Sequence, residues 1–144
     1  MIKFRDSLPS DMPFVYNSWI NSARNDHMNM RKSVFVETFL PSINNILEYS
    51  KILIACDDVD PNFIIGYIVY SKIDDIVILH WAYTKEVNRK MGVFKALVRE
   101  LEPRFPDEPV VATYKSDKRQ KLFDKYKIVY KPELRRVYDK TKVY

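Results

Sequence analysis

Residues 51–84 read KILIACDDVDPNFIIGYIVYSKIDDIVILHWAYT. Within this stretch three runs, at residues 51–56, 63–70 and 76–83, are rich in β-branched and aromatic residues, which favour strands. Short segments that contain aspartates separate the runs, and aspartate is typical of turns. The stretch therefore predicts a meander of three antiparallel strands joined by polar turns.

The segment before the meander predicts a strand followed by helices. Residues 2–5 alternate apolar and polar side chains, as a half-buried strand does. From residue 10 onward apolar side chains recur at helical spacing, and a second helix is expected over residues 34–49. The polar stretch 21–32 indicates a loop or a broken helix between them. Pro41 is expected to end or kink the second helix, because proline lacks the N–H that a helix interior needs.

After the meander the spacing of apolar residues changes to that of a helix, over residues 92–101. Further elements are expected as a strand at 109–113, a helix at 118–126, and strands at 128–130 and 136–138. The predicted order is β-α-α-β-β-β-α-β-α-β-β. Because the antiparallel meander precedes the later helices, this order predicts an α+β fold with a mixed, mostly antiparallel central sheet flanked by helices.

The composition is that of one globular domain. At 144 residues, with 47% hydrophobic and 30% charged residues, the chain predicts a single domain over residues 1–144. Its only cysteine, Cys56, excludes an intramolecular disulfide, and two histidines without matching carboxylates predict no metal site. No apolar run approaches the roughly 20 residues that a membrane helix needs, so we expect no membrane partner and a cytoplasmic location.

Basic residues gather at the C-terminal end. The whole chain carries a net charge of +5, but residues 115–144 hold eleven Lys or Arg against four Asp or Glu. A basic face of this kind attracts nucleic acid, an acidic protein or a polyanionic cofactor, or is simply a solvated surface. The sequence leaves these alternatives open, although no helix-turn-helix or zinc motif accompanies the charge.

The segment Arg89-Lys90-Met91-Gly92-Val93-Phe94 lies between the last strand of the meander and the next predicted helix. A helix N-terminus presents unpaired backbone N–H groups and the positive end of its dipole, which together suit a pyrophosphate. Gly92 would let the backbone approach such an anion closely, because glycine has no Cβ. Arg89, Lys90 and Lys95 add positive charge nearby. The segment therefore indicates an anion site.

Together with the element order, this segment resembles the GCN5-related N-acetyltransferases (GNAT), whose motif is Arg or Gln, two residues, Gly, one residue, then Gly or Ala. Phe94 stands where that family has Gly or Ala. Residues 63–69 resemble the family's third strand and residues 116–125 its last helix, with Ser116 at the position of the usual Asn. The few glycines and the Lys- and Tyr-rich end also resemble phage-encoded proteins.

The resemblance implies the acyl-CoA N-acyltransferase fold and transfer of an acetyl group from acetyl-CoA to an amine. The acceptor is left open between a small amine, a protein amine and a nucleobase, and a homodimer is a further open alternative. In the family the acetyl carbonyl meets backbone N–H groups of the fourth strand, here Ala82-Tyr83-Thr84. The implied cofactor-binding residues are Ala82, Tyr83, Thr84, Arg89, Lys90, Met91, Gly92, Val93, Phe94, Lys95 and Ser116.

His80 is the candidate base. It lies in the predicted fourth strand, nine residues before Arg89, where serotonin-type members of the family carry a histidine. Imidazole suits proton transfer near neutral pH. If side chains alternate along the strand, His80 faces the same side of the sheet as Ala82. The alternative is a histidine that packs in the core beside Trp81.

The family's usual proton donor for the departing thiolate is replaced. Many members use a tyrosine in the last helix, and here that residue is Phe123. Tyr126 is therefore the candidate acid, with Tyr114, Tyr130 or water as alternatives. Phe94 and Phe123 together favour a second hypothesis, a catalytically inactive GNAT-like binding or inhibitory module, for which the basic C-terminal segment would offer a nucleic-acid surface.

Overall fold

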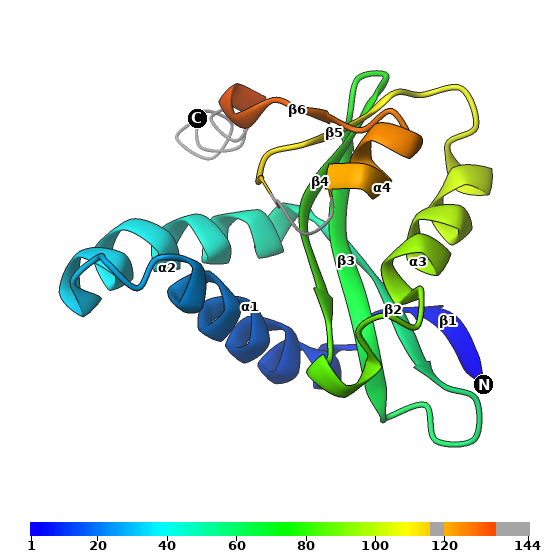
Figure 1. Ribbon diagram of the computed structural model, residues 1–144, viewed down its shortest axis with the longest axis horizontal. Coiled ribbons are helices and arrows are strands. Elements are labelled where there is room, and N and C mark those ends of the chain that lie inside the picture. The colour runs from blue at the N-terminus through cyan, green and yellow to red at the C-terminus, as the bar shows by residue number, and fades with distance from the viewer. Residues whose placement is uncertain (116–119, 135–144) are drawn as a thin grey trace.

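A computed structural model describes residues 1–115 and 120–134, which form a sheet flanked by helices (Figure 1). Six strands of these residues pair in the order β1-β2-β3-β4-β5-β6. They are β1 (Ile2–Asp6), β2 (Lys51–Asp57), β3 (Ile64–Ile73), β4 (Ile76–Thr84), β5 (Val110–Ala112) and β6 (Val129–Tyr130). The helices are α1 (Met12–Asp26), α2 (Lys32–Tyr49), α3 (Val93–Leu101) and α4 (Gln120–Lys125).

The strands pair antiparallel from β1 to β4 and parallel from β4 to β6. The predicted α+β class with a mixed, mostly antiparallel sheet is therefore confirmed, and so is the meander that forms β2, β3 and β4. The strand expected at 136–138 lies outside the described residues.

The helices cover both faces of the sheet. α1 and α2 lie on one side, and α3 and α4 on the other (Figure 1). We call these sides the α1–α2 face and the α3–α4 face. Along β2, Leu53 and Ala55 pack on the α3–α4 face, whereas Ile52 and Ile54 pack on the α1–α2 face. Both faces of the central strands are buried, which explains why the meander is apolar almost throughout.

α1 continues through much of the polar stretch for which the sequence predicts a loop or a broken helix. Ala23 is buried in the cluster on the α1–α2 face. The guanidinium of Arg24 donates hydrogen bonds to the carbonyls of His27 at 2.9 Å and Met30 at 2.8 Å. These bonds satisfy carbonyl groups just beyond the helix and hold the chain there. The helix continues to Asp26, so the loop is shorter than expected.

The expected second helix forms as α2 and runs through Pro41, so of the two effects expected of Pro41, the end of the helix is wrong. The proline itself is exposed. Phe35 lies before it, and Ile43 and Ile46 lie after it, and all three are buried against the sheet. Burying each of these side chains contributes about 1.5–3 kcal/mol, which offsets the roughly 3 kcal/mol that an interior proline costs.

A bulge interrupts the alternation of side chains in β4. Val69 of β3 lies opposite Trp81, but Tyr70 lies opposite Leu79, so His80 is the extra residue of the bulge. Leu79 and Ala82, three residues apart, consequently pack in the same cluster on the α3–α4 face. The alternation of side chains between the two faces of the sheet therefore shifts by one residue at the bulge.

β4 and β5 part immediately after the bulge begins. The two strands pair only between residues 77–79 and residues 110–112, although β4 continues to Thr84. The last bond between them runs from the backbone N–H of Thr113 to the carbonyl of Leu79, at 3.2 Å. We call residues 80–84 of β4 and residues 113–114 after β5 the strand fork.

Candidate functional site

The loop from β4 to α3 ends at a glycine that its backbone conformation requires. Gly92 is the N-cap of α3 and has a φ of 73°, in the left-handed region that glycine adopts freely. Lys90 has a φ of 74°, which is uncommon for a residue with a side chain. The carbonyl of Gly92 accepts the N–H of Ala96 at 3.0 Å. A Cβ at position 92 would meet nothing within 4 Å, so the helix start is open on that side.

Basic side chains surround this helix start. Nε of Arg89 donates to the carbonyl of Thr84 at 3.2 Å, which ties the loop to the end of β4. Arg89 and Lys90 are exposed, and Lys95 is half-buried. Within the described part of the chain, no carboxylate lies at ion-pair distance from these three cations. Their charge is therefore available to an anionic ligand.

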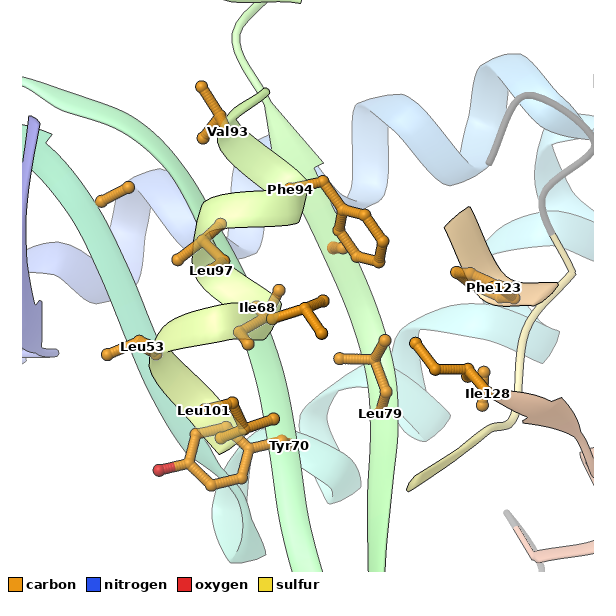
Figure 2. Close-up of a cluster of buried hydrophobic side chains, with 14 of the residues drawn as sticks. Leu53, Ile68, Tyr70, Leu79, Val93, Phe94, Leu97, Leu101, Phe123 and Ile128 are labelled. Atoms are coloured by element: carbon orange, nitrogen blue, oxygen red, sulfur yellow. The ribbon is translucent and has the colours of Figure 1, made fainter. Parts of the chain in front are cut away.

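The two residues after Gly92 face the core. Val93 and Phe94 are 2% and 5% exposed, whereas Met91 is 63% exposed. The ring of Phe94 lies 5.9 Å from the ring of Phe123 of α4, between the helix and the sheet (Figure 2). The large side chain at the motif position that usually holds Gly or Ala therefore packs in the core and does not cover the helix N-terminus.

The backbone of β4 presents polar groups to the strand fork. The N–H of Lys85 donates to the carbonyl of Ile65 at 2.9 Å, so this residue bonds towards β3. Because bonding directions alternate along an antiparallel strand, the N–H of Tyr83 also points to β3. The N–H groups of Ala82 and Thr84 consequently point away from β3, towards the fork. The three predicted strand residues thus lie where β5 has left the sheet.

No protein-family model and no curated protein matches the sequence, but solved structures match the fold. An acetyltransferase from Corynebacterium glutamicum, described as histone acetyltransferase HPA2 and related acetyltransferase, has a TM-score of 0.67 at 15% identity, over 86% of this chain and 82% of that chain. A GNAT family acetyltransferase from Brucella melitensis in complex with acetyl-CoA has a TM-score of 0.59 at 12% identity, over 85% and 81% of the two chains.

A third structure agrees with these two. The PaiA N-acetyltransferase from Thermoplasma acidophilum in complex with coenzyme A has a TM-score of 0.54 at 18% identity, over 74% of this chain and 72% of that chain. The chain has the GNAT fold. At these identities the likeness concerns the fold, and the chemistry must be argued from the residues of this chain.

Within the GNAT fold of this chain, His80 lies on a different face from the one predicted. Its Nε2 shares a hydrogen bond of 2.9 Å with Oγ of Ser71, and both residues are buried. Val69, two residues before Ser71 on β3, packs on the α1–α2 face, which places Ser71 and His80 on that face as well. Ala82 packs on the α3–α4 face. The predicted common face is wrong because the bulge breaks the alternation.

The candidate acid lies on the α3–α4 face. Tyr126 follows α4, packs against the cluster on that face and donates its backbone N–H to the carbonyl of Leu122 at 3.0 Å. Its hydroxyl is buried and has no hydrogen-bond partner in the part of the chain that the structure describes. Phe123 is a core residue, 2% exposed, whereas Tyr130 is 47% exposed on β6. Ser116 lies outside the described residues.

Three residues with polar groups near the fork are not among the site residues that the sequence predicts. Ser71 contacts His80, and Thr113 directly follows β5. The indole of Trp81 stacks on Trp19 with ring centres 5.8 Å apart, and its centre lies 5.1 Å from that of Tyr114. In the sequence, Ser71 and Thr113 are marked only as polar residues next to apolar strands. That mark indicates a site only when the pairing of the strands is known.

Other classes of site find little support in the described residues. No group of three or more His, Cys, Asp or Glu side chains is close enough there to hold a metal ion. None of the described helices combines the length and the apolar character that crossing a membrane demands. The basic segment lies partly outside the described residues, so a nucleic-acid surface stays a prediction. A homodimer likewise stays a prediction.

Proposed function

We propose that the protein is an N-acetyltransferase that moves an acetyl group from acetyl-CoA to an amine. One observation carries the proposal: α3 begins at Gly92, a short loop beyond the β4 segment from which β5 has parted. This unit offers helix N–H groups for a diphosphate and a strand edge for an extended arm. Two structures of the same fold are complexes with coenzyme A or acetyl-CoA, which supports this cofactor.

The start of α3 would hold the diphosphate. A Cβ at Gly92 would meet nothing within 4 Å, so an anion could approach the backbone of residues 91–93 from that side. The positive end of the helix dipole favours a diphosphate at this point. Arg89, Lys90 and Lys95 would add charge-assisted hydrogen bonds.

The strand fork would hold the arm that carries the acetyl group. The N–H of Thr84 points to the side that β5 has left, so it is directed towards an arm lying there. A backbone N–H directed at the thioester oxygen would stabilise the negative charge that develops on it during attack by the amine. This is the role that we assign to the segment from Ala82 to Thr84.

The two faces of the sheet separate the two proton transfers. The diphosphate site and Tyr126 belong to the α3–α4 face, whereas His80 belongs to the α1–α2 face. An amine that reaches the thioester from the α1–α2 face would pass His80, which would take up its proton. Tyr126, whose buried hydroxyl has no partner among the described residues, would protonate the departing thiolate. Opposite faces would thus supply base and acid.

Calorimetric titration with acetyl-CoA tests the proposal, with two variants of one residue as a matched pair. Gly92→Asp and Gly92→Asn introduce side chains of the same shape, and both residues tolerate a positive φ better than most. Asp adds a carboxylate where the diphosphate would lie, and Asn does not. We expect a dissociation constant of about 1–100 μM for the wild type. Gly92→Asn should bind within about threefold of it, and Gly92→Asp at least about tenfold more weakly, which corresponds to about 1.4 kcal/mol.

Equal affinities of the two variants would contradict the assignment of the helix start as the diphosphate site. Absence of acetyl-CoA binding by the wild type would contradict the proposed function as a whole. Circular dichroism of all three proteins controls for folding.

A second candidate function has one specific observation in its favour. Phe123 fills the position of the family's proton-donating tyrosine and is buried in the core. A binding or inhibitory module with the GNAT fold would tolerate this change without any substitute donor. It would bind acetyl-CoA in the same titration but release no free thiol from acetyl-CoA in the presence of any amine, which a thiol reagent measures directly.

A further inference from the structure

Thr113 has a buried hydroxyl group that makes no hydrogen bond to residues 1–115 or 120–134. The residue directly follows β5, and its backbone N–H donates to the carbonyl of Leu79 at 3.2 Å. Only 3% of the residue is exposed. Most buried hydroxyl groups in proteins are hydrogen-bonded, so a group that is not requires a physical explanation.

The two neighbours of Thr113 in the sequence place its side chain on the α1–α2 face, which is also the face of His80. Ala112 and Tyr114 both belong to the cluster on the α3–α4 face, so the residue between them is directed to the other face. Leu79 pairs with Ala112 in parallel register, so His80 and Thr113 each directly follow the last paired position of their strands. Both residues therefore lie at the strand fork, on the face opposite to the start of α3.

Ser71, His80 and Thr113 thus form a row of buried polar side chains across three neighbouring segments of the sheet. Ser71 and His80 bond to each other at 2.9 Å. Thr113 is the member whose side chain is unsatisfied within the described residues, and the indole Nε1 of Trp81, also at the fork, is unsatisfied there as well. An unsatisfied buried group destabilises the protein, and a ligand that bonds to it removes this cost.

We infer that Thr113 is a contact residue for the acceptor amine, and this inference rests on the proposed function. Oγ1 of Thr113 accepts a hydrogen bond from an N–H of the neutral amine. This bond orients the nitrogen so that its lone pair faces the acetyl carbonyl carbon. The nitrogen then bonds to that carbon, the C–S bond breaks, and the sulfur keeps the electron pair. The amine nitrogen loses one proton to His80, and the thiolate gains one from Tyr126.

Two substitutions of Thr113 test this assignment. Thr113→Val replaces an unsatisfied hydroxyl by a methyl group of similar size, and Thr113→Ser keeps the hydroxyl. The measurements are the melting temperature, the dissociation constant of acetyl-CoA, and acetyl transfer to hydroxylamine. This probe is a small nucleophilic amine that needs no pocket for a side chain.

We expect Thr113→Val to keep or raise the melting temperature and to bind acetyl-CoA within about twofold of the wild type. Its KM for hydroxylamine should rise, with a loss of about tenfold in kcat/KM, as one lost hydrogen bond to substrate would give. Thr113→Ser should restore kcat/KM to within about threefold. A merely structural role of Thr113 would change stability and would not raise KM selectively.

Three results would overturn the assignment. The first is an unchanged KM and kcat in Thr113→Val, and the second is a lower melting temperature for this variant, which would mean that the hydroxyl already has a partner. The third is a wild type that binds acetyl-CoA but does not acetylate hydroxylamine, which would remove the amine site and leave the cofactor site standing. Failure of the wild type to bind acetyl-CoA would instead overturn the proposed function.

Discussion

The side chains of Ser71 and His80 meet across neighbouring strands, with 2.9 Å between Oγ and Nε2. Ser71 is 6% exposed and His80 is 0% exposed, so this hydrogen bond is buried in the protein. The bond lies at the bulge, between the part of β4 that pairs with β5 and the strand fork. It therefore holds the imidazole at the point where β4 changes from a core strand to a lining of the candidate site.

Replacing Ser71 by alanine should destabilise the protein. The substitution leaves a buried ring nitrogen of His80 without its present partner, and such a loss costs about 1–3 kcal/mol. Urea unfolding monitored by circular dichroism measures the change in the free energy of unfolding. Thr113→Val is the matched control, because it removes a hydroxyl that has no partner among the described residues. If the free energy of unfolding falls equally in both variants, the hydrogen bond between Ser71 and His80 does not contribute to stability.

The ion pair of Arg5 and Asp11 should make stability depend on pH. Two guanidinium nitrogens of Arg5 donate to the two carboxylate oxygens of Asp11, at 2.7 and 2.9 Å, and the backbone N–H of Leu8 adds a third bond at 2.7 Å. The hydrogen bonds from Arg5, more than any other cause, lower the pKa of Asp11 below its ordinary value of 3.8. A lowered pKa contributes stability that is present above the ordinary value and is lost as pH falls through the folded-state value.

Asp11→Asn should therefore destabilise the protein by about 1.5–3 kcal/mol at pH 6, the usual strength of a hydrogen bond to a charged group. The difference from the wild type should shrink as pH falls below about 4, where the unfolded carboxyl group takes up a proton. Asp58→Asn is the control: Asp58 pairs with the N-terminal amine at 3.5 Å and is 46% exposed, so it should change stability by less than about 0.5 kcal/mol. A difference for Asp11→Asn that stays constant between pH 6 and pH 3 would contradict this account.

Replacing Tyr126 by phenylalanine should slow acetyl transfer without loss of stability. The hydroxyl forms no bond to any described residue, so its removal breaks none of them. If Tyr126 protonates the thiolate, kcat should fall at least about tenfold, while the affinity for acetyl-CoA stays within about twofold. Tyr130→Phe, at an exposed tyrosine of β6, is the control and should leave kcat unchanged. An unaltered kcat in Tyr126→Phe would assign the proton to another donor.

The sequence predicts most of the fold because its strands and helices differ clearly in the spacing of apolar residues. The meander appears as expected, since β-branched runs bounded by aspartates permit few other structures. The end of α1 is harder to predict, because the buried Ala23 and the bonds from Arg24 to carbonyls beyond the helix leave no pattern in the sequence. The effect of Pro41 is also hard to predict, because the burial of Phe35 and Ile46 outweighs the tendency of proline to end a helix.

The candidate site is only partly predictable. The basic loop and Gly92 stand out in the sequence because a motif fixes their spacing, and the structure adds that the backbone of Gly92 is left-handed. The face of His80 depends on the bulge, which shifts the pairing with β3 by one residue and leaves no mark in the residue types. Thr113 is likewise an ordinary strand residue until its neighbours across the sheet are known.

The stacked pair formed by Trp19 and Trp81 gives the protein an optical probe at the strand fork. The chain has two tryptophans, and both rings belong to this one stack, with 11° between their planes. Intrinsic emission excited at the indole band therefore originates entirely beside the fork. A ligand that enters there and disturbs the contact of Trp81 with Tyr114 would change the emission of the whole protein. Rapid-mixing fluorescence thus gives the rates of ligand entry and release without any attached dye.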